Sequence, residues 1–313
     1  MGGWVILYQP NAHESLSSRI PSPRESGFTT STAVPLYWTA YGAVGAPRLL
    51  LLHGGPGAHH DYMLPQMLRL AGSHELIFYD QRGGGRSKTN SREAITWQTH
   101  ADDLRALVSE FGVEPVSLLG YSWGAMLALL YALEAYEDAA SSPPQRMVLM
   151  SPAPLTREYR SEYEDEFDRR MAGNNVRTLR EELATSGLRE RDPAAYRQRG
   201  FELSVAGFFA DPARARDLTP FKVTGRVQQS VWESLGDFDI LPRLSAIQCP
   251  TLILHGRADP IPLASSEAAA RIMPNAKLVV LDSSGHVPYV EQPEELFSAI
   301  ELFLADTAPG SHQ

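Results

Sequence analysis

The chain has 313 residues, of which 43% are hydrophobic and 21% are charged, and its formal net charge is -9 at pH 7. This composition is typical of a globular protein and excludes the disordered and fibrous classes. The acidic balance argues against nucleic acids and anionic membranes as partners, and the single cysteine, Cys249, excludes an intramolecular disulfide and is expected to be a small buried residue at the start of a strand.

Residues 1–20 are predicted to form a loosely ordered leader. They lack the positively charged start and the long apolar stretch of a secretory signal peptide. The sequence contains no run of about 18 apolar residues, so no membrane span is predicted. We therefore expect a cytoplasmic protein.

Strand and helix patterns alternate through the first half of the chain. Short stretches rich in β-branched and aromatic residues, and continuous apolar runs typical of buried parallel strands, predict four strands. Two segments between and after them have helical spacing of their apolar residues. The predicted strands are residues 27–32, 35–41, 48–53 and 75–79, and the predicted helices are residues 61–70 and 97–111.

A glycine cluster at residues 83–85 follows the strand at 75–79 and was compared with the dinucleotide-binding fingerprint. The third glycine of that fingerprint would fall at Lys88, and polar loop residues follow where a helix should begin. No phosphate-binding loop, Cys-x-x-Cys pair or His-Glu-x-x-His motif occurs either. We expect no cofactor and no metal.

The most informative stretch is residues 116–126, where a short β-rich run ends in Gly120-Tyr121-Ser122-Trp123-Gly124 and an Ala- and Leu-rich helical run begins. Glycines on both sides allow a tight turn between strand and helix. Such a turn lifts a serine clear of the sheet edge and is the setting of a nucleophile elbow. The pattern predicts that Ser122 is a catalytic nucleophile.

In the second half of the chain, predicted strands and helices alternate again after one interruption. Residues 155–236 contain no clear buried strand and are predicted to form an inserted helical cap. Residues 21–154 and 237–313 are predicted to form one α/β core, a mostly parallel central sheet with helices on both faces. Its later strands are predicted at residues 146–150, 249–254 and 277–281, and its later helices at 125–133, 263–273 and 293–304.

A serine nucleophile needs a base and an acid that orients the base. In a parallel sheet, functional residues are usually located at the carboxyl ends of the strands. His286 follows the last predicted strand and Asp259 follows the strand before it, so we predict His286 as the base and Asp259 as the acid.

Other assignments of base and acid stay open at this point. The alternative base is His255, while His53 is expected to hydrogen-bond its own glycine loop. Asp282 is an alternative acid, and Asp237 and Asp239 are expected to be solvated or capping residues. Histidines without strand-end context are expected at the surface, and these are His59, His60, His74 and His100.

The oxyanion of an acyl-transfer reaction needs two N–H donors aimed at one point. The N–H of Trp123 is one candidate because it follows the nucleophile, and Gly55 is the other because a glycine permits close backbone approach. The indole of Trp123 is also expected to wall the acyl pocket.

Five motifs together resemble the proline iminopeptidase branch of the α/β-hydrolases. They are His53-Gly54-Gly55-Pro56-Gly57, Asp80-Gln81-Arg82-Gly83-x-Gly85-x-Ser87, Gly120-x-Ser122-Trp123-Gly124, His255-Gly256-Arg257-x-Asp259 and Gly285-His286. The order Ser, Asp, His along the chain agrees with this resemblance. It implies an α/β-hydrolase fold and the removal of an N-terminal residue, preferably proline, from short peptides.

The resemblance also implies acidic cap residues that hold the substrate's free amine. Glu202, in an aromatic-rich stretch, and Glu233, beside Trp232, are the candidates, whereas the acidic run at residues 162–168 is expected to be an exposed face. The expected substrate is a small peptide or a small acyl compound. The alternatives are a carboxylesterase or amidase for uncharged acyl substrates and a hydrolase-like receptor without turnover, and the sequence leaves the oligomeric state open.

Overall fold

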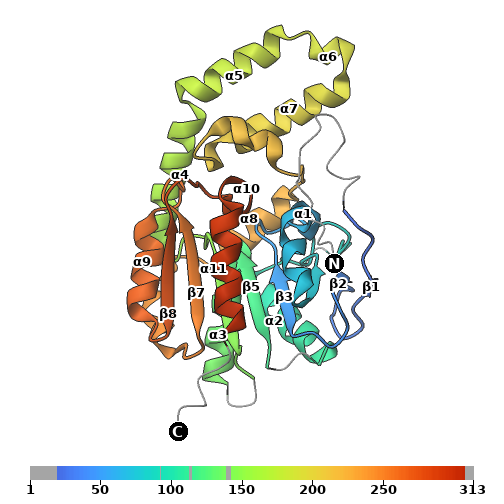
Figure 1. Ribbon diagram of the computed structural model, residues 1–313, viewed down its shortest axis with the longest axis vertical. Helices are drawn as coiled ribbons and strands as arrows, with labels where there is room; N and C mark the ends of the chain where they lie inside the picture. The colour runs from blue at the N-terminus through green and yellow to red at the C-terminus, as the bar shows by residue number, and fades with distance from the viewer. Residues whose placement is uncertain (1–19, 92, 113–114, 139–141, 307–313) are drawn as a thin grey trace, which may run out of the picture.

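The computed structural model describes residues 20–91, 93–112, 115–138 and 142–306, and its centre is an eight-stranded sheet (Figure 1). The strand order is β1-β2-β4-β3-β5-β6-β7-β8. Strand β2 pairs antiparallel with β1 and β4, and every other pair is parallel. The strands are β1 (Glu25–Phe28), β2 (Tyr37–Tyr41), β3 (Arg48–Leu52), β4 (Glu75–Tyr79), β5 (Ser117–Tyr121), β6 (Arg146–Met150), β7 (Thr251–Gly256) and β8 (Ala276–Leu281).

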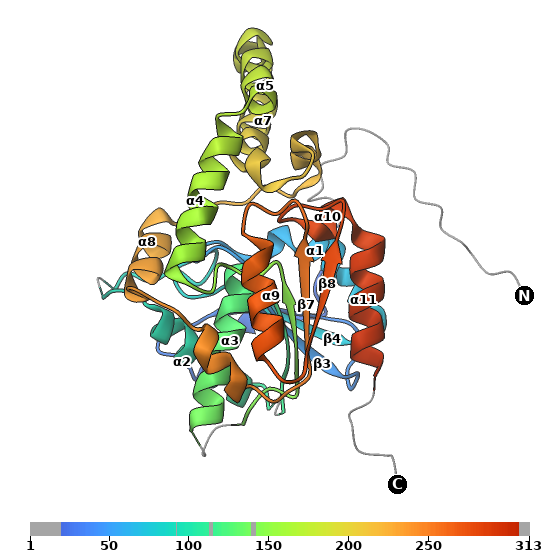
Figure 2. The ribbon, with the colours of Figure 1, turned by 90° about the vertical axis from the view of Figure 1, so that its left-hand side faces the viewer.

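Alternating strand residues feed two hydrophobic clusters, one on each face of the sheet. In β3, for example, Leu50 and Leu52 belong to one cluster and Leu49 and Leu51 to the other, as the period of two in a strand requires. On the first face lie helices α2 (Trp97–Glu110), α3 (Trp123–Glu137) and α9 (Leu263–Ile272), and on the second lie α1 (Leu64–Met67), α10 (Pro288–Glu291) and α11 (Pro293–Ala305) (Figure 2). A mostly parallel sheet covered by helices on both faces is the predicted fold class, which is confirmed.

Most predicted elements differ from the structure by a few residues at their ends, and two differ more. The hairpin of β1 and β2 closes early because the Thr29 hydroxyl accepts the Leu36 N–H at 2.8 Å, so the strand predicted at residues 27–32 is found at Glu25–Phe28. The helix predicted at residues 61–70 is divided into η2 (His60–Tyr62), α1 and η3 (Leu68–Gly72). Pro65 has no N–H to donate to an earlier turn, so one continuous helix cannot pass through it.

Residues 155–236, here called the cap segment, lie between β6 and β7 and contain helices and no strand among the described residues. Helices α5, α6 and α7 stand far from the sheet, whereas α8 lies beside the core (Figures 1 and 2). Whether the cap segment is a domain of its own stays a prediction. Its helices are α4 (Arg157–Met171), α5 (Asn174–Thr185), α6 (Leu188–Arg191), α7 (Pro193–Val205), η4 (Ala206–Phe208), η5 (Pro212–Asp217) and α8 (Gly225–Ser234), and η6 (Leu241–Ala246) follows it.

The remaining expectations concern the leader, the membrane and Cys249. Of the predicted leader, only Ile20 lies within the described residues. In the described part of the chain no helix has both the length and the apolar character needed to cross a bilayer. Cys249 is buried, as predicted, and forms no disulfide, but it precedes β7, which begins at Thr251.

Candidate active site

Ser122 occupies the turn between β5 and α3, with φ 52° and ψ -116°. This is a rare conformation for a residue other than glycine, and it marks a strained turn of the kind found at functional sites. The flanking glycines are required by space. A Cβ on Gly120 would lie 2.4 Å from the Gly124 oxygen, and a Cβ on Gly124 would lie 2.1 Å from the Leu52 oxygen. The sequence Gly-x-Ser-x-Gly therefore fits this backbone.

The structure brings together the three side chains predicted as nucleophile, base and acid. The distance from His286 Nε2 to Ser122 Oγ is 3.0 Å. On the other side of the ring, His286 Nδ1 lies 2.9 Å from Asp259 Oδ2. The three residues come from the ends of β5, β7 and β8, so the carboxyl edge of the sheet assembles them.

The Asp259 carboxylate fixes the orientation of the imidazole. Burial opposes its ionisation, but His286 and the Ile261 N–H, at 2.8 Å from Oδ1, more than offset this and hold the pKa of Asp259 below its usual range. An ionised carboxylate can only accept, so His286 Nδ1 carries the proton and donates it to Asp259. His286 Nε2 is then left with its lone pair directed at the Ser122 hydroxyl, as a general base requires.

The alternative bases and acids are engaged elsewhere. His255 is buried, with Nδ1 2.8 Å from Ser266 Oγ and Nε2 3.1 Å from the Ile261 oxygen. Asp282 is exposed and pairs with Arg257 at 2.7 Å. These contacts favour His286 and Asp259 over both alternatives.

Gly55 and Trp123, the predicted oxyanion donors, both line the cavity that contains Ser122. Gly55 has φ +66°, a conformation that favours glycine. Among the described residues, neither backbone N–H has a protein acceptor. A Cβ on the neighbouring Gly54 would lie 2.9 Å from the Ser122 Cβ, which shows how closely this loop approaches the turn. The two N–H groups are available for an oxyanion.

Gln81 joins the Gly55 loop to the turn at Ser122. Its N–H donates to His53 Nε2 at 3.0 Å, and its side-chain amide donates to the His53 oxygen at 2.8 Å. Its side-chain oxygen accepts the Trp123 indole N–H at 2.9 Å. His53 Nδ1 also lies 2.9 Å from the Gly54 oxygen, which confirms that His53 serves its own loop.

Two of the four histidines expected at the surface are buried. His60 contacts Asp80 and Thr39 inside the fold, and His100 packs edge-on against the Trp123 ring at 6.0 Å. The surface prediction was wrong for both because it relied on strand ends alone, and neither residue lies at one. His59 and His74 are half-buried.

A cavity of about 1020 Å³ opens onto Ser122 and is walled by both the core and the cap segment. Its volume is at the upper end of the range for small-molecule sites. Among the described residues no group of three or more His, Cys, Asp or Glu side chains is placed to hold a metal. The main-chain and side-chain lining includes Gly55, Tyr62, Tyr121, Trp123, Arg160, Glu164, Phe208, Leu218, Phe221, Val223, Trp232, Glu233, Asp237, His286 and Tyr289.

The two glutamates predicted to bind an amine occupy different places. Glu233, on α8, lines the cavity and accepts a hydrogen bond from Gln229 at 2.7 Å. Glu202 lies instead at a separate pocket of about 160 Å³ inside the cap segment, paired with Arg199 and hydrogen-bonded by Gln198. Glu202 is therefore not among the residues that line the cavity with Ser122, and two cap side chains contact its carboxylate.

Sequence reasoning missed two carboxylates that line the cavity, Glu164 and Asp237. Glu164 pairs with Arg160 at 2.7 Å, and Asp237 has no ion-pair partner in the described part of the chain. The sequence feature that could have identified Glu164 is its helical spacing. Arg157, Arg160 and Glu164 lie at i, i+3 and i+7 and share one face of α4, which lines the cavity. Asp239, by contrast, accepts the Leu241 N–H at 3.0 Å but is not the N-cap of η6, which is Ile240.

The loop that carries the predicted base, His286, is hydrogen-bonded to the cap segment and to α10. The His286 N–H donates to the Phe208 oxygen at 2.7 Å, and the two rings are 5.1 Å apart. The Glu291 carboxylate accepts the N–H of Gly285 at 2.7 Å and that of Ala210 at 2.8 Å. Burial raises the pKa of Glu291, although these N–H groups favour its ionised form. The cap segment therefore contacts the backbone beside the predicted base.

Comparisons with known proteins find matches over most of the chain. Residues 49–299 match the profile of the alpha/beta hydrolase family. The chain is 26% identical to a proline iminopeptidase of Heyndrickxia coagulans over 274 residues, covering 83% of this chain and 91% of the relative. It is 28% identical to a proline iminopeptidase of Clostridium botulinum over 292 residues, covering 86% and 94%.

Solved structures of several hydrolases share the fold. A proline iminopeptidase of Mycobacterium smegmatis superposes with a TM-score of 0.64 at 21% identity, covering 90% of this chain and 97% of the other. An esterase of Exiguobacterium antarcticum superposes with a TM-score of 0.65 at 22% identity, covering 90% of this chain and all of the other (100%). At these identities the likeness concerns the fold alone.

Proposed function

Since the chain belongs to the alpha/beta hydrolase family, we propose that it is a serine hydrolase that releases an N-terminal proline, or a similar small residue, from short peptides or related amides. The observation that carries the proposal is the hydrogen-bonded series Ser122, His286 and Asp259, at 3.0 and 2.9 Å, of which Ser122 and His286 line the cavity. The similarity to proline iminopeptidases, at 26% and 28% identity, supports the choice of substrate.

In the proposed reaction Ser122 Oγ attacks the carbonyl carbon while its proton passes to His286 Nε2. The carbonyl oxygen becomes an oxyanion and accepts the N–H groups of Gly55 and Trp123. The intermediate then collapses: the C–N bond breaks, and His286 Nε2–H gives its proton to the leaving nitrogen. Water, deprotonated by His286, attacks the acyl-serine ester and releases the free amino acid and Ser122.

The carboxylates of the cap side are the proposed partners of the substrate's free amine. An ammonium group taken out of water needs an opposite charge nearby. Glu233 was predicted for this role, and Asp237 joins it because it lines the same cavity and forms no ion pair among the described residues. Glu164 shares the cavity but is already paired with Arg160.

A second candidate function is a carboxylesterase or amidase for uncharged acyl substrates. The apolar lining around Phe208, Leu218 and Phe221 favours it, because these side chains suit an uncharged group. The two candidates differ in one testable property, which is the need for a free amine on the substrate.

The test is hydrolysis of L-prolyl p-nitroanilide and of its N-acetylated form by the wild-type protein and by Ser122→Ala. We expect turnover of the free-amine compound only, and a loss of about 10⁴-fold or more in kcat for Ser122→Ala. Ser245→Ala, at an exposed serine, is the matched control and keeps full activity. Equal turnover of both compounds would favour the second candidate, and full activity of Ser122→Ala would remove the mechanism.

A further inference from the structure

The walls of the cavity divide into two compartments that belong to opposite faces of the sheet. One compartment extends from the first hydrophobic cluster, where the Trp123 and Trp232 rings lie 5.5 Å apart and the Arg160 guanidinium lies 3.9 Å from the Trp232 ring centre. It also holds Glu233, on the same helix as Trp232. We call it the polar compartment.

The other compartment extends from the second hydrophobic cluster and is aromatic and aliphatic. The Tyr62 ring lies 4.4 Å from Phe221 and 6.2 Å from Tyr121, and Tyr121 lies 5.2 Å from Tyr289. Leu218 of the cap segment completes this wall. We call it the apolar compartment.

The position of the base decides which part of a substrate enters which compartment. In the proposed mechanism His286 Nε2 protonates the leaving nitrogen, so the leaving group lies on the His286 side of Ser122. The rings next to His286 are Tyr121 at 5.3 Å, which belongs to the second cluster, and Phe208 at 5.1 Å, which packs against that cluster. The leaving group is therefore directed into the apolar compartment, and the acyl group with its amine into the polar one.

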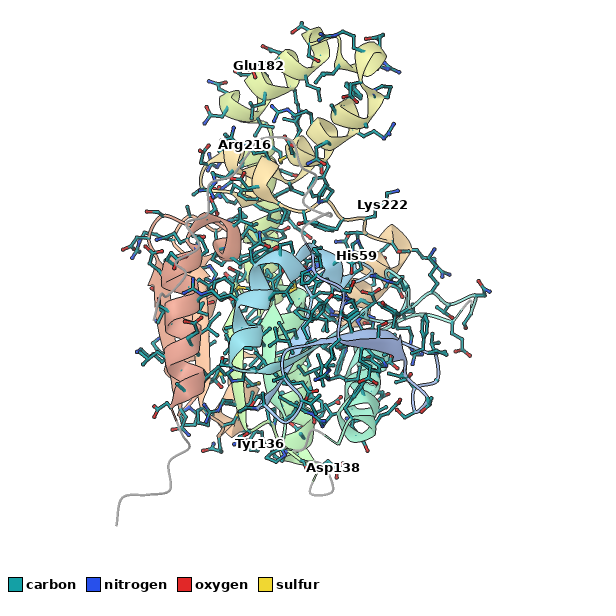
Figure 3. The ribbon with its side chains drawn as sticks, turned by 45° about the vertical axis from the view of Figure 1, so that its right-hand side comes forward. His59, Tyr136, Asp138, Glu182, Arg216 and Lys222 are labelled. Atoms are coloured by element: carbon teal, nitrogen blue, oxygen red, sulfur yellow. The ribbon has the colours of Figure 1, made fainter. Side chains whose placement is uncertain are left out.

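The apolar compartment is unsuited to the rest of an ordinary peptide. A dipeptide would place its carboxylate there, and a buried charge without a partner is costly. Among the described residues that line this compartment none carries a positive charge. Lys222, between Phe221 and Val223, is exposed and extends away from the molecule at its edge (Figure 3), and it is not part of the lining.

From these contacts we infer that the substrates are aminoacyl amides whose leaving amine carries a bulky, uncharged apolar group. This inference rests on the proposed function and adds the class of the leaving group. The cavity of about 1020 Å³ has room for such a group beside a prolyl residue, since sites of about 300–1,000 Å³ enclose drug-sized ligands.

The test compares three substrates with the same prolyl group: prolyl methylamide, prolyl n-hexylamide and prolyl-glycine. Each methylene buried in an apolar site raises kcat/KM by roughly fourfold, so burial of about half of the five extra methylenes makes the hexylamide better than the methylamide by about 30-fold. We expect prolyl-glycine to be at least about tenfold worse than the hexylamide because of its carboxylate.

A variant of the compartment wall checks the origin of this preference. In Phe221→Ala the ratio of hexylamide to methylamide kcat/KM should fall by about fivefold to tenfold. The ratio does not depend on how much of the variant is folded. Phe28→Ala, at a phenylalanine that is 53% exposed, is the matched control and keeps the wild-type ratio.

The outcomes separate this inference from the proposed function. Equal values for the methylamide and the hexylamide, a preference for prolyl-glycine, or an unchanged ratio in Phe221→Ala would overturn the inference and leave the aminopeptidase proposal standing. Turnover of none of the three compounds would overturn the proposed function and this inference with it.

Discussion

Among the described residues, two buried pairs of histidine and aspartate are joined at hydrogen-bond distance, and the histidine of each pair also faces a hydroxyl side chain. His286 contacts Asp259 at 2.9 Å and Ser122 at 3.0 Å. His60 contacts Asp80 at 2.6 Å and the Thr39 hydroxyl at 3.1 Å. By residue type and distance the two arrangements are nearly the same.

The surroundings of the hydroxyl distinguish the two arrangements. Thr39 lies within β2 and is 2% exposed, whereas Ser122 lies on a strained turn at the cavity. Thr39 and His60 are absent from the described lining of that cavity. A series of hydrogen bonds supports catalysis only where a substrate carbonyl and oxyanion donors can reach it.

Asp80 has a structural use of its own. Burial opposes its ionisation, but the hydrogen bond from His60 and the N–H of Arg86 hold the pKa of Asp80 well below its usual range. It also accepts the His60 N–H at 3.0 Å. The His60 pair therefore ties the loop after Gly55 to the end of β4.

The largest expected effect is a catalytic difference between the two histidines. His286→Gln removes the general base and should lower kcat by about 10⁴-fold or more. His60→Gln should keep kcat within about tenfold, because it does not touch the reacting atoms. Steady-state kinetics with a prolyl arylamide measures both, and comparable losses in the two variants would break the distinction.

The opposite difference is expected in stability. Asp80→Asn leaves the buried His60 without its carboxylate, and breaking such a pair costs about 3–5 kcal/mol. Denaturant unfolding at pH 7 measures this loss, with Asp282→Asn at an exposed carboxylate as the control. An Asp80→Asn protein as stable as the wild type would show that the His60 pair has no structural role.

A smaller effect is expected for a residue that positions the loop of the predicted base but takes no part in the reaction. Glu291→Gln keeps the size of the side chain but weakens its hold on Gly285 and Ala210, so we expect kcat to fall by about tenfold with KM nearly unchanged. The control is Glu294→Gln, on the next helix, whose carboxylate is 79% exposed. A change in KM alone would assign Glu291 to substrate binding and not to positioning.

The last effect concerns two buried histidines, His53 and His100, that have no hydrogen-bonded carboxylate partner among the described residues. Burial lowers the pKa of His53 to about 4 and that of His100 to about 3. Because the unfolded chain takes up these protons first, near pH 6.5, stability falls as the pH drops below about 6.5, by up to about 1.4 kcal/mol per pH unit for each histidine.

The dependence of stability on pH can be assigned to one of the two histidines by mutation. His100→Gln should reduce the proton uptake on unfolding by about one between pH 6 and pH 4.5, measured from denaturant midpoints across that range. An unchanged slope in His100→Gln would mean that His100 is already protonated in the folded protein.

The core and its candidate site were largely predictable from the sequence, and the cap segment was not. Ser122, Asp259 and His286 follow strands whose apolar runs are visible in the sequence, and parallel strands deliver their ends to one edge. The side chains at that edge meet at 2.9 and 3.0 Å in the structure. Local pattern and simple topology were sufficient there.

In the cap segment no comparable rule links position in the sequence to position in space. Glu202 and Glu233 both lie on helices beside aromatic residues, yet only Glu233 reaches the cavity, because the packing of α7 and α8 differs. His60 shows the same limit inside the core, since its partner Asp80 is 20 residues away and is brought to it by the loop after β3. Contacts of this kind depend on tertiary packing and produce no periodic pattern in the sequence.

The most direct test of the central claim is the reaction of the folded protein with a fluorophosphonate, followed by peptide mapping with mass spectrometry. The reagent phosphonylates a serine only when a neighbouring base activates it. We predict a single modified residue, Ser122, no modification of Thr39, and loss of the modification in His286→Gln. Modification of another residue, or an unmodified Ser122 in protein that hydrolyses its substrate, would contradict the account.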